Sequence, residues 1–252
     1  MRVLLPPGRC GEVVGEDPSE ALLRELYTYP PGGWLRANMV STLDGAATGP
    51  DGLSGSISSD ADKRVFTVLR TLADVVLVGA GTVRAERYAP EEPPDELAAL
   101  RTAEGRRPAP PFAVVTRSCD VPAALFDGDL GTLVVTCAAA GPPALARVRD
   151  LAGDDGVIVA GGEAVDLRRA LDELAERGLR HVLCEGGPTL LSELIAAGAL
   201  DELCLTTAPV IATGVARRID VASVQGPGRR VSPGHVLAGD DGSLIGRWVV
   251  GD

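Results

Sequence analysis

Short, nearly continuous apolar runs recur along the chain, and they constrain its fold more than any other feature. These runs stand at 35–41, 74–79, 112–116, 132–136, 156–160, 181–185 and 202–210. Strands of this kind are typical of parallel sheets that helices cover on both faces. Apolar residues at helical spacing predict helices over 60–72 and 164–177, and a third over 188–197. The alternation predicts an α/β layered fold with a mostly parallel central sheet.

Three other segments depart from this pattern. Residues 235–251 place Asp-Gly between two apolar runs, which is typical of an antiparallel hairpin that closes the sheet. The stretches 89–111 and 138–156 are rich in Pro, Glu and Ala, and the first predicts a surface excursion with about one helical turn. Because strand and helix signals continue on both sides of each stretch, we expect neither to be a linker between domains.

Composition excludes several classes of function. A chain of 252 residues, 45 % hydrophobic, can bury a sizeable core without disulfides or a structural metal. A net charge of −11 and 3 % aromatic residues argue against a nucleic-acid partner. Lys63 is the only lysine, so no P-loop Gly-Lys-Ser/Thr can be written.

The cysteines and the length of the apolar runs indicate the compartment. No apolar run approaches the length that spans a bilayer. The cysteines are scattered and odd in number, which predicts small buried thiols in a reducing compartment. They are Cys10, Cys119, Cys137, Cys184 and Cys204. We therefore expect a cytoplasmic protein that binds no membrane.

Two glycine-rich corners follow predicted strands. The first consists of Gly79, Ala80, Gly81 and Thr82, and the second of Gly186, Gly187, Pro188, Thr189 and Leu190. Bare amides at such corners can approach a phosphate at a helix start. A plain tight turn explains either corner alone, and Arg84 stands where Gly-x-Gly-x-x-Gly needs its third glycine, so a standard Rossmann fingerprint fails. Two corners at the ends of parallel strands nevertheless favour a ligand site.

Two acidic residues are candidates for chemistry, each with an alternative. Asp44 precedes glycine after a predicted strand, which an ordinary Asp-Gly turn also explains. Asp62 falls in the first turn of the helix over 60–72, where an acid stabilises the helix dipole. Asn38 and Ser41 are polar where a core strand favours apolar residues.

A strand end also carries a candidate cofactor ligand. Thr116 ends the run at 112–116 and Arg117 follows it, and an arginine beside a nucleotide site often holds a ribose 2′-phosphate. An exposed loop arginine is the alternative. His181 and His235 lack metal-ligand spacing, and no Cys-x-x-Cys occurs, so we expect no metal site.

Four segments in this order resemble the reductase domain of the riboflavin-pathway pyrimidine deaminase–reductases, a family with a dihydrofolate reductase-like fold. They are "NMVSTLDGAAT", "ISSDADKRVFTVLRTLADVVLVGAGTVRAERY", "VVTR" and "LRHVLCEGGPTLLSELIAAGALDELCLTTAPVI". The pattern is similar to that of stand-alone actinobacterial members. It implies a single reductase domain over 1–252, with residues 1–33 as an N-terminal extension and no deaminase domain.

The resemblance also implies roles for named residues. NADPH would lie on the two glycine corners, with Thr116 and Arg117 near its adenosine end and Gly161 and Gly162 close by. The substrate side would be lined by Asn38, Ser41, Asp44, Ser58 and Glu185. Asp62 and Asp44 would be the catalytic carboxylates, and Asp62 is similar in placement to the acid with which dihydrofolate reductases hold the pterin ring.

The implied function is an NADPH-dependent reductase, expected as a homodimer, that transfers hydride to the C=N carbon of a pyrimidine resembling 5-amino-6-ribosylaminouracil 5′-phosphate. Asn38 stands where bacterial members usually carry lysine, and 86–88 replaces the usual Asp-Asp-Pro. These departures keep two alternatives open: a dihydrofolate or pterin reductase, and an NADPH-binding protein without reductase activity. A Rossmann dehydrogenase using NADH is a further alternative.

Overall fold

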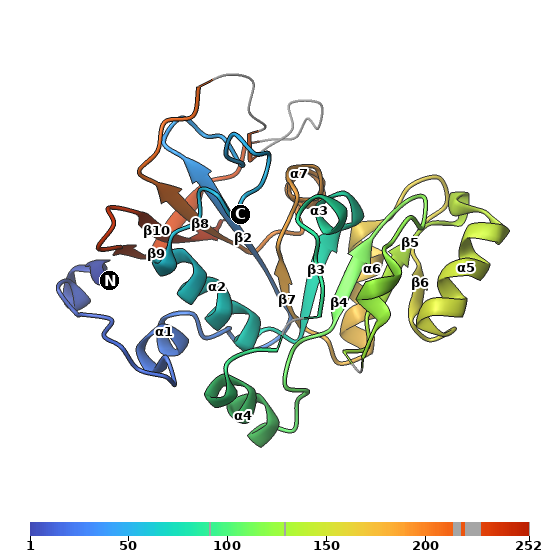
Figure 1. The fold of residues 1–252 in the computed structure, drawn as a ribbon, viewed down its shortest axis with the longest axis horizontal. Coiled ribbons are helices and arrows are strands. Elements are labelled where there is room, and N and C mark those ends of the chain that lie inside the picture. The colour runs from blue at the N-terminus through green and yellow to red at the C-terminus, as the bar shows by residue number, and fades with distance from the viewer. Residues whose placement is uncertain (91, 129, 214–217, 220–227, 252) are drawn as a thin grey trace.

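The computed structural model describes residues 1–90, 92–128, 130–213, 218–219 and 228–251. Within these residues the strands form one ten-stranded sheet of order β1-β9-β10-β8-β2-β7-β3-β4-β5-β6 (Figure 1). The strands are β1 (Arg2–Leu5), β2 (Trp34–Thr42), β3 (Val75–Gly79), β4 (Phe112–Val115), β5 (Leu133–Thr136), β6 (Val157–Val159), β7 (His181–Cys184), β8 (Glu202–Ala208), β9 (Val231–Ala238) and β10 (Leu244–Val250). The helices are α1 (Ala21–Leu26), α2 (Asp60–Leu72), α3 (Ala80–Ala85), α4 (Asp95–Ala103), α5 (Pro142–Ala152), α6 (Leu167–Glu176) and α7 (Pro188–Ala196).

The direction of the strands confirms the predicted fold class. Strands β8, β2, β7, β3, β4, β5 and β6 pair in parallel, whereas β10, β9 and β1 add antiparallel strands beyond β8. Each of the seven predicted apolar runs contains a strand, with ends within two residues of those expected. The hairpin is also confirmed, although its first strand begins at Val231 rather than at 235.

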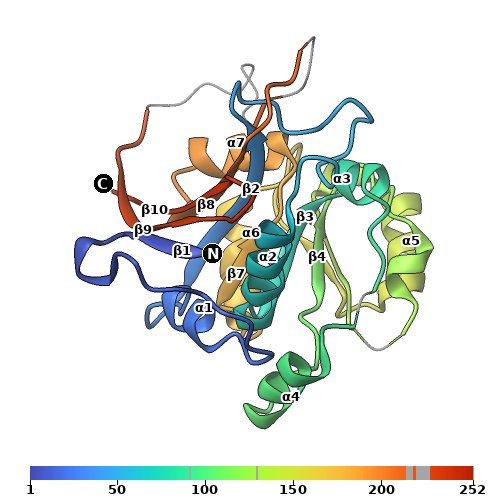
Figure 2. The ribbon, with the colours of Figure 1, turned by 60° about the vertical axis from the view of Figure 1, so that its left-hand side comes forward.

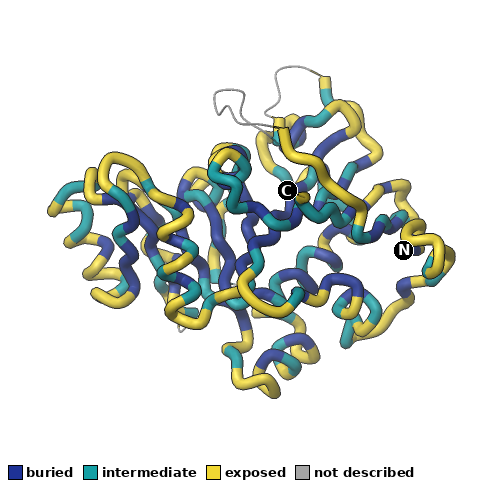
Figure 3. The backbone as a smooth tube through the Cα atoms, turned by 180° about the vertical axis from the view of Figure 1, so that it is seen from behind, coloured by how far each residue is buried: buried dark blue, intermediate teal, exposed yellow. Residues whose placement is uncertain are grey.

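Side-chain alternation along the strands builds a core on each face of the sheet. Val76 and Val78 of β3 pack in the cluster that includes Val65 and Leu69 of α2. Leu77, between them, packs on the other face in the cluster that includes α6 and α7. Figure 1 shows α2 in front of the strands and α6 behind them, and Figure 2 turns this arrangement by 60°. The parallel strands β2, β3, β4, β5 and β7 are therefore mostly buried on both sides, and buried residues are dark blue in Figure 3.

In the described part of the chain, four α-helices lie outside the predicted ones, and two of them correct the interpretation of the Pro-rich stretches. Residues 89–111 contain the nine-residue helix α4 rather than about one turn, because Leu97 is buried on its inner side. Residues 138–156 contain α5, whose first residue is Pro142 and which buries Val148. Proline suits the first turn of a helix, where its missing N–H has no intrahelical partner. Helices α1 and α3 are short, with six residues each.

The N-terminal residues complete one end of the sheet. Strand β1 pairs with β9, and α1 packs beside α2. The tyrosines that follow α1 cover a buried ion pair between Arg36 and Glu202, since the Tyr27 carbonyl accepts from Arg36 at 2.8 Å and the Tyr29 ring lies 4.0 Å from the Arg36 guanidinium carbon. His235 packs edge-on against Tyr27 at 4.5 Å.

Four of the five cysteines are buried thiols as predicted, but Cys10 is exposed because it lies in a surface turn after β1. In the part of the chain that the structure describes, every helix is too short or too polar to cross a lipid bilayer.

Candidate active site

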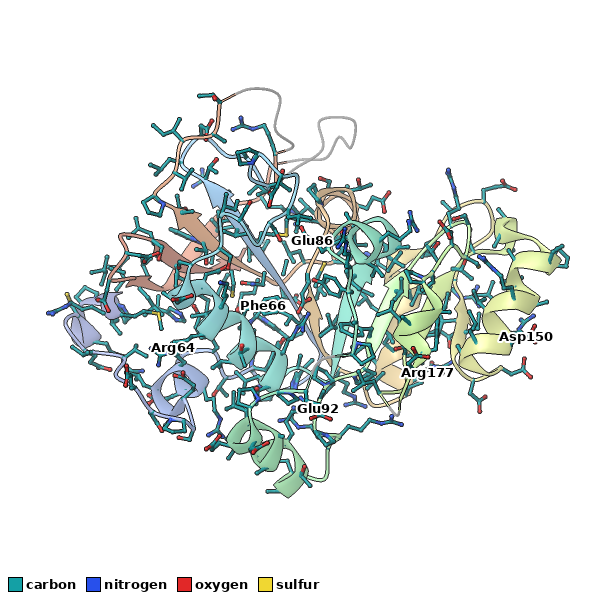
Figure 4. The ribbon with its side chains drawn as sticks, in the orientation of Figure 1. Arg64, Phe66, Glu86, Glu92, Asp150 and Arg177 are labelled. Atoms are coloured by element: carbon teal, nitrogen blue, oxygen red, sulfur yellow. The ribbon has the colours of Figure 1, made fainter. Side chains whose placement is uncertain are left out.

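The carboxyl ends of β2, β3, β4 and β7 surround a cavity of about 2110 Å³. Its wall includes Phe66 of α2 and Glu86 at the end of α3, both labelled in Figure 4. Most of the predicted site residues line it: Asn38, Ser58, Asp62, Glu185 and the segments 79–82, 116–117 and 187–190. Ligands of α/β proteins collect at this edge of the sheet. The structure therefore brings the predicted cofactor and substrate residues to one place.

The two glycine corners form a single surface. Gly79 donates its N–H to the Gly186 carbonyl at 2.8 Å, which joins the ends of β3 and β7. Gly186 has φ +79°, and its peptide bond to Gly187 is cis. A Cβ on Gly187 would lie 2.5 Å from the Thr82 hydroxyl, so a larger residue there would have to displace the Thr82 side chain. A Cβ on Gly81 would have no described atom within 4 Å, so the peptide there faces open space.

This surface fits an anionic cofactor. Helix α7 begins at Pro188, and its first residues line the cavity, so its unpaired amides and its dipole favour negative charge there. The open space beside Gly81 leaves room for a phosphate. Thr116 is buried, and Arg117 is exposed after β4 on the same cavity.

Asp62 is a buried carboxylate on the cavity wall. Its side chain accepts hydrogen bonds at 2.6 Å from the hydroxyls of Ser58 and Thr206. Burial raises the pKa of Asp62, although these two hydrogen bonds act in the opposite direction. The helix N-cap is instead Ser59, whose hydroxyl accepts from the Asp62 N–H at 3.2 Å. The Asp62 carboxylate therefore does not cap the helix but accepts from Ser58, just before the helix, and from Thr206 on β8.

Glu185 is held by two residues that sequence reasoning missed. Arg70 of α2 donates to both of its oxygens, at 2.7 and 2.8 Å, and the Tyr88 hydroxyl donates to one of them at 2.6 Å. The Arg70 guanidinium carbon lies 4.3 Å from the centre of the Phe66 ring. Burial, and next the negative charge of Glu185, raise the pKa of Tyr88. An arginine beside Phe66 and Leu69 in an amphipathic helix was the available signal for this partner.

Two predicted substrate residues lie outside the cavity wall. Asp44 is exposed in the turn after β2, where it accepts from the Thr42 hydroxyl at 2.6 Å and the Ala212 N–H at 3.0 Å. These hydrogen bonds lower the pKa of Asp44. Ser41 is buried within β2. Their functional assignment stays a prediction.

Three predicted glycines also lie outside the wall, although their neighbours contribute to it. The carbonyls of Gly161 and Gly162 accept from the amides of Ala138 and Ala139, which fixes a short 3₁₀ turn. Residues 164–167, which follow Gly161 and Gly162, line the cavity instead of them. The third glycine is Gly186, whose neighbour Gly187 lines the cavity.

Further wall residues escaped the sequence reasoning. The loop over 47–55 contributes to the wall, and the Glu86 carboxylate holds it by accepting from the Ser54 N–H at 2.8 Å. Lys63 also lines the cavity. Among the described residues, no group of three His, Cys, Asp or Glu is arranged to hold a metal ion.

The profile of one protein family, the RibD C-terminal domain, matches residues 33–231. The chain belongs to the RibD C-terminal domain family. This membership confirms the family predicted from the four sequence segments, and it identifies the protein as an oxidoreductase.

Similar proteins place this family member among reductases. It is 32 % identical over 183 residues to the 2,5-diamino-6-ribosylamino-4(3H)-pyrimidinone 5′-phosphate reductase of Archaeoglobus fulgidus, covering 72 % of this chain and 82 % of that protein. It is 27 % identical over 220 residues to the riboflavin biosynthesis protein RibD of Mycobacterium tuberculosis, covering 86 % of this chain and 53 % of that protein. A solved pyrimidine reductase-like protein from Corynebacterium diphtheriae superposes with a TM-score of 0.79 at 28 % identity, covering 87 % of this chain and 92 % of that one, which confirms the fold.

Proposed function

We propose that this protein reduces a ribosylaminopyrimidine 5′-phosphate with NADPH, as a step of riboflavin biosynthesis. The observation that carries the proposal is the joining of two glycine corners with the buried carboxylates Asp62 and Glu185 in one cavity. The A. fulgidus relative is named for such a reaction, which supports the same substrate class.

The cofactor part of the proposal assigns a role to each corner. Residues 79–82 and 187–190 would hold the phosphates of NADPH, and Arg117 would pair with its 2′-phosphate. Bound NADPH supplies a hydride. The proposed preference for NADPH over NADH depends on Arg117, so substitution of Arg117 tests this preference.

The substrate part concerns the charge that develops in the reaction. A C=N bond takes one hydride on carbon and one proton on nitrogen, so the reactive form is a positively charged iminium. A nearby carboxylate stabilises that charge. Of the two predicted catalytic acids, Asp62 lines the cavity and Asp44 does not. We therefore assign the electrostatic role to Asp62.

The mutation Asp62→Ala tests this assignment. We expect turnover to fall about 10²-fold or more while NADPH affinity stays nearly unchanged, because the Asp62 carboxylate is bound by Ser58 and Thr206, which belong to neither glycine corner. Steady-state rates and calorimetric titration with NADPH measure the two quantities. Turnover equal to that of the unmodified protein would remove Asp62 from the mechanism.

The decisive experiment compares substrates. The purified protein is given NADPH with a ribosylaminopyrimidine 5′-phosphate, and separately with dihydrofolate, and NADPH oxidation is followed by its absorbance. We expect oxidation with the pyrimidine. Oxidation with dihydrofolate alone would support the pterin reductase, and binding of NADPH without oxidation by either would support a protein that only binds the cofactor.

A homodimer in the cytoplasm completes the proposal. The large apolar side chains of Leu43, Val210 and Ile211 are exposed close together, since the Leu43 N–H bonds the Val210 carbonyl at 2.8 Å. Exposed apolar patches of this kind often mark subunit contacts. Light scattering gives the mass in solution, and a monomer would refute the dimer.

A further inference from the structure

A second cavity, of about 570 Å³, lies at the other end of the sheet from the candidate active site. Asp74, just before β3, and His181, the first residue of β7, line it together with α1. The first cavity surrounds the opposite, carboxyl ends of β3 and β7. Figure 1 shows α1 and α4 near one end of these strands and α3 and α7 near the other. The two cavities are therefore separate, and the proposed reduction does not use the second one.

The acids of the second cavity already have partners within the protein. Asp74 accepts from two backbone N–H groups, at 2.8 and 3.0 Å. Glu25 forms an ion pair with Arg9 at 2.9 Å, and Glu104 forms one with Arg106. These three carboxylates therefore need no further ligand.

Two hydrogen-bond donors in the same wall lack a partner. The Nε of Arg24, on α1, is buried without a hydrogen bond to any residue that the structure describes. The Tyr29 hydroxyl is buried and unpaired in the same sense, in a residue only 9 % exposed. The Tyr29 ring is held in place, since it stacks on His181 with the ring centres 4.6 Å apart. Burial raises the pKa of Tyr29, so its hydroxyl keeps the proton and is available to donate. Buried donors of this kind need an acceptor.

Both donors suit an oxyanion. A guanidinium binds carboxylate and phosphate oxygens through charge-assisted hydrogen bonds, and a hydroxyl donates to the same oxygens. Within the described ranges, Arg24 makes no ion pair that would compete with such a ligand. The cavity falls within the about 300–1,000 Å³ of small-molecule pockets, so it has room for an organic group besides the anion.

We propose that this cavity is a second ligand site, which binds a small organic anion by placing its carboxylate or phosphate group against Arg24 and the Tyr29 hydroxyl. The site is independent of the cofactor and the pyrimidine, because it shares no lining residue with the candidate active site. His181 reports on a ligand there, since it lines the same wall with its side chain 31 % exposed.

The test follows the ring protons of His181 by proton NMR. The unmodified protein, without NADPH, is titrated at constant pH with benzoate, with phenyl phosphate and with neutral benzamide. The chain has two histidines, and the signal that disappears in His235→Phe identifies the other one. An aromatic ring shifts the resonances of protons beside it, so a probe in this cavity moves the His181 signal. We expect a saturable shift with benzoate, phenyl phosphate or both, and none with benzamide.

Three variants assign the binding to the proposed donors. Arg24→Met keeps an unbranched chain without the charge and should raise the Kd of the bound anion at least about tenfold. Tyr29→Phe removes only the hydroxyl and should raise this Kd about tenfold. The midpoint of its urea unfolding should stay unchanged or rise, because the buried hydroxyl has no described hydrogen bond to lose. Arg149→Met is the matched control, because it removes an equal charge from an exposed arginine on α5 and should leave the Kd unchanged.

The outcomes separate the source of the anion and the validity of the site. A saturable shift with benzoate alone assigns the site to carboxylates, and one with phenyl phosphate alone assigns it to phosphate esters. The site is refuted if neither anion gives a saturable shift, or if benzamide gives an equal one. It is also refuted if Arg24→Met or Tyr29→Phe binds as tightly as the unmodified protein, or if Arg149→Met weakens binding as much as Arg24→Met. Because no NADPH oxidation is measured, failure here leaves the proposed reductase function untouched.

Discussion

The ion pair between Arg70 and Glu185 allows a quantitative test of how the cavity is held together. Its side chains are 18 % and 2 % exposed. Arg70→Met keeps an unbranched apolar chain beside Phe66 but removes the guanidinium, so Glu185 retains only the Tyr88 hydroxyl among the partners described above. Removing one partner of a buried ion pair costs about 3–5 kcal/mol. Because Arg70 is partly exposed, we expect about 3 kcal/mol, the lower end of that range.

Thermal and urea unfolding measure this loss. For a chain of this size, 1 kcal/mol corresponds to about 2–4 °C in Tm, so Arg70→Met should lower Tm by about 6–12 °C. Arg84→Met is the control, because Arg84 lines the same cavity but its side chain is 45 % exposed and its ion pair with Asp120 spans 3.2 Å. An exposed pair of this kind contributes about 0–1 kcal/mol.

A second substitution identifies the cause of the loss. Adding Glu185→Gln to Arg70→Met removes the unpaired negative charge of Glu185 and leaves an amide oxygen that accepts from the Tyr88 hydroxyl. The double variant should therefore be more stable than Arg70→Met alone by about 1 kcal/mol or more. The interpretation as a buried, mutually dependent pair is refuted if the losses of stability in Arg70→Met and in Glu185→Gln alone simply add in the double variant. It is also refuted if Arg70→Met is as stable as the Arg84→Met control.

Three further predictions address the cofactor surface and the fold. Gly81→Ala should raise the NADPH Kd about tenfold in calorimetry, because the added Cβ meets no described protein atom and enters the open space proposed for a phosphate. The free energy of unfolding should change by less than about 1 kcal/mol. Unchanged affinity would show that NADPH does not lie on the glycine corner at 79–82. Arg117→Gln should weaken NADPH binding at least about tenfold while sparing NADH, and equal weakening of both would exclude a 2′-phosphate contact. Burial, and next the charge of Arg247, lower the pKa of His235 from 6.5 to about 4. As the pH falls, the unfolded chain therefore binds a proton at His235 before the folded chain does. The free energy of unfolding of the unmodified protein should fall by about 3 kcal/mol relative to that of His235→Phe between pH 6.5 and pH 4, as measured by urea titration. Free energies that change in parallel with pH in the two proteins would disprove this prediction.

The sequence predicts the parallel part of the sheet well because its central strands are buried on both faces. A run such as 74–79 needs only apolar residues between helices, and that composition is visible without any partner. The helix α2 is predicted with its observed ends, since Val65, Val68 and Leu69 form one face of it. The helix α5 is missed because Pro142 reads as a loop signal unless the helix start is already known.

The site is predicted less completely, because its contacts join residues far apart in the chain. Glu185 is expected on the substrate side, but the bond from Arg70 spans 115 positions, and no local pattern contains it. The same holds for Thr206, which holds Asp62 across 144 positions. The glycine corners are found because close backbone approach demands a particular residue type, whereas an ion pair does not.

The position of β2 between β7 and β8 has a consequence for synthesis of the protein. Its partners on both sides lie in the last third of the chain, and Arg36 meets Glu202 only across 166 positions. While the ribosome is still translating the middle of the chain, β2 has neither neighbour, and its apolar side chains stay available to chaperones or to other nascent chains. Because Asn38 lies on β2 and Glu185 follows β7, the candidate cavity forms only when translation is nearly complete. A stalled chain would then present an open, aggregation-prone sheet rather than a partly active enzyme.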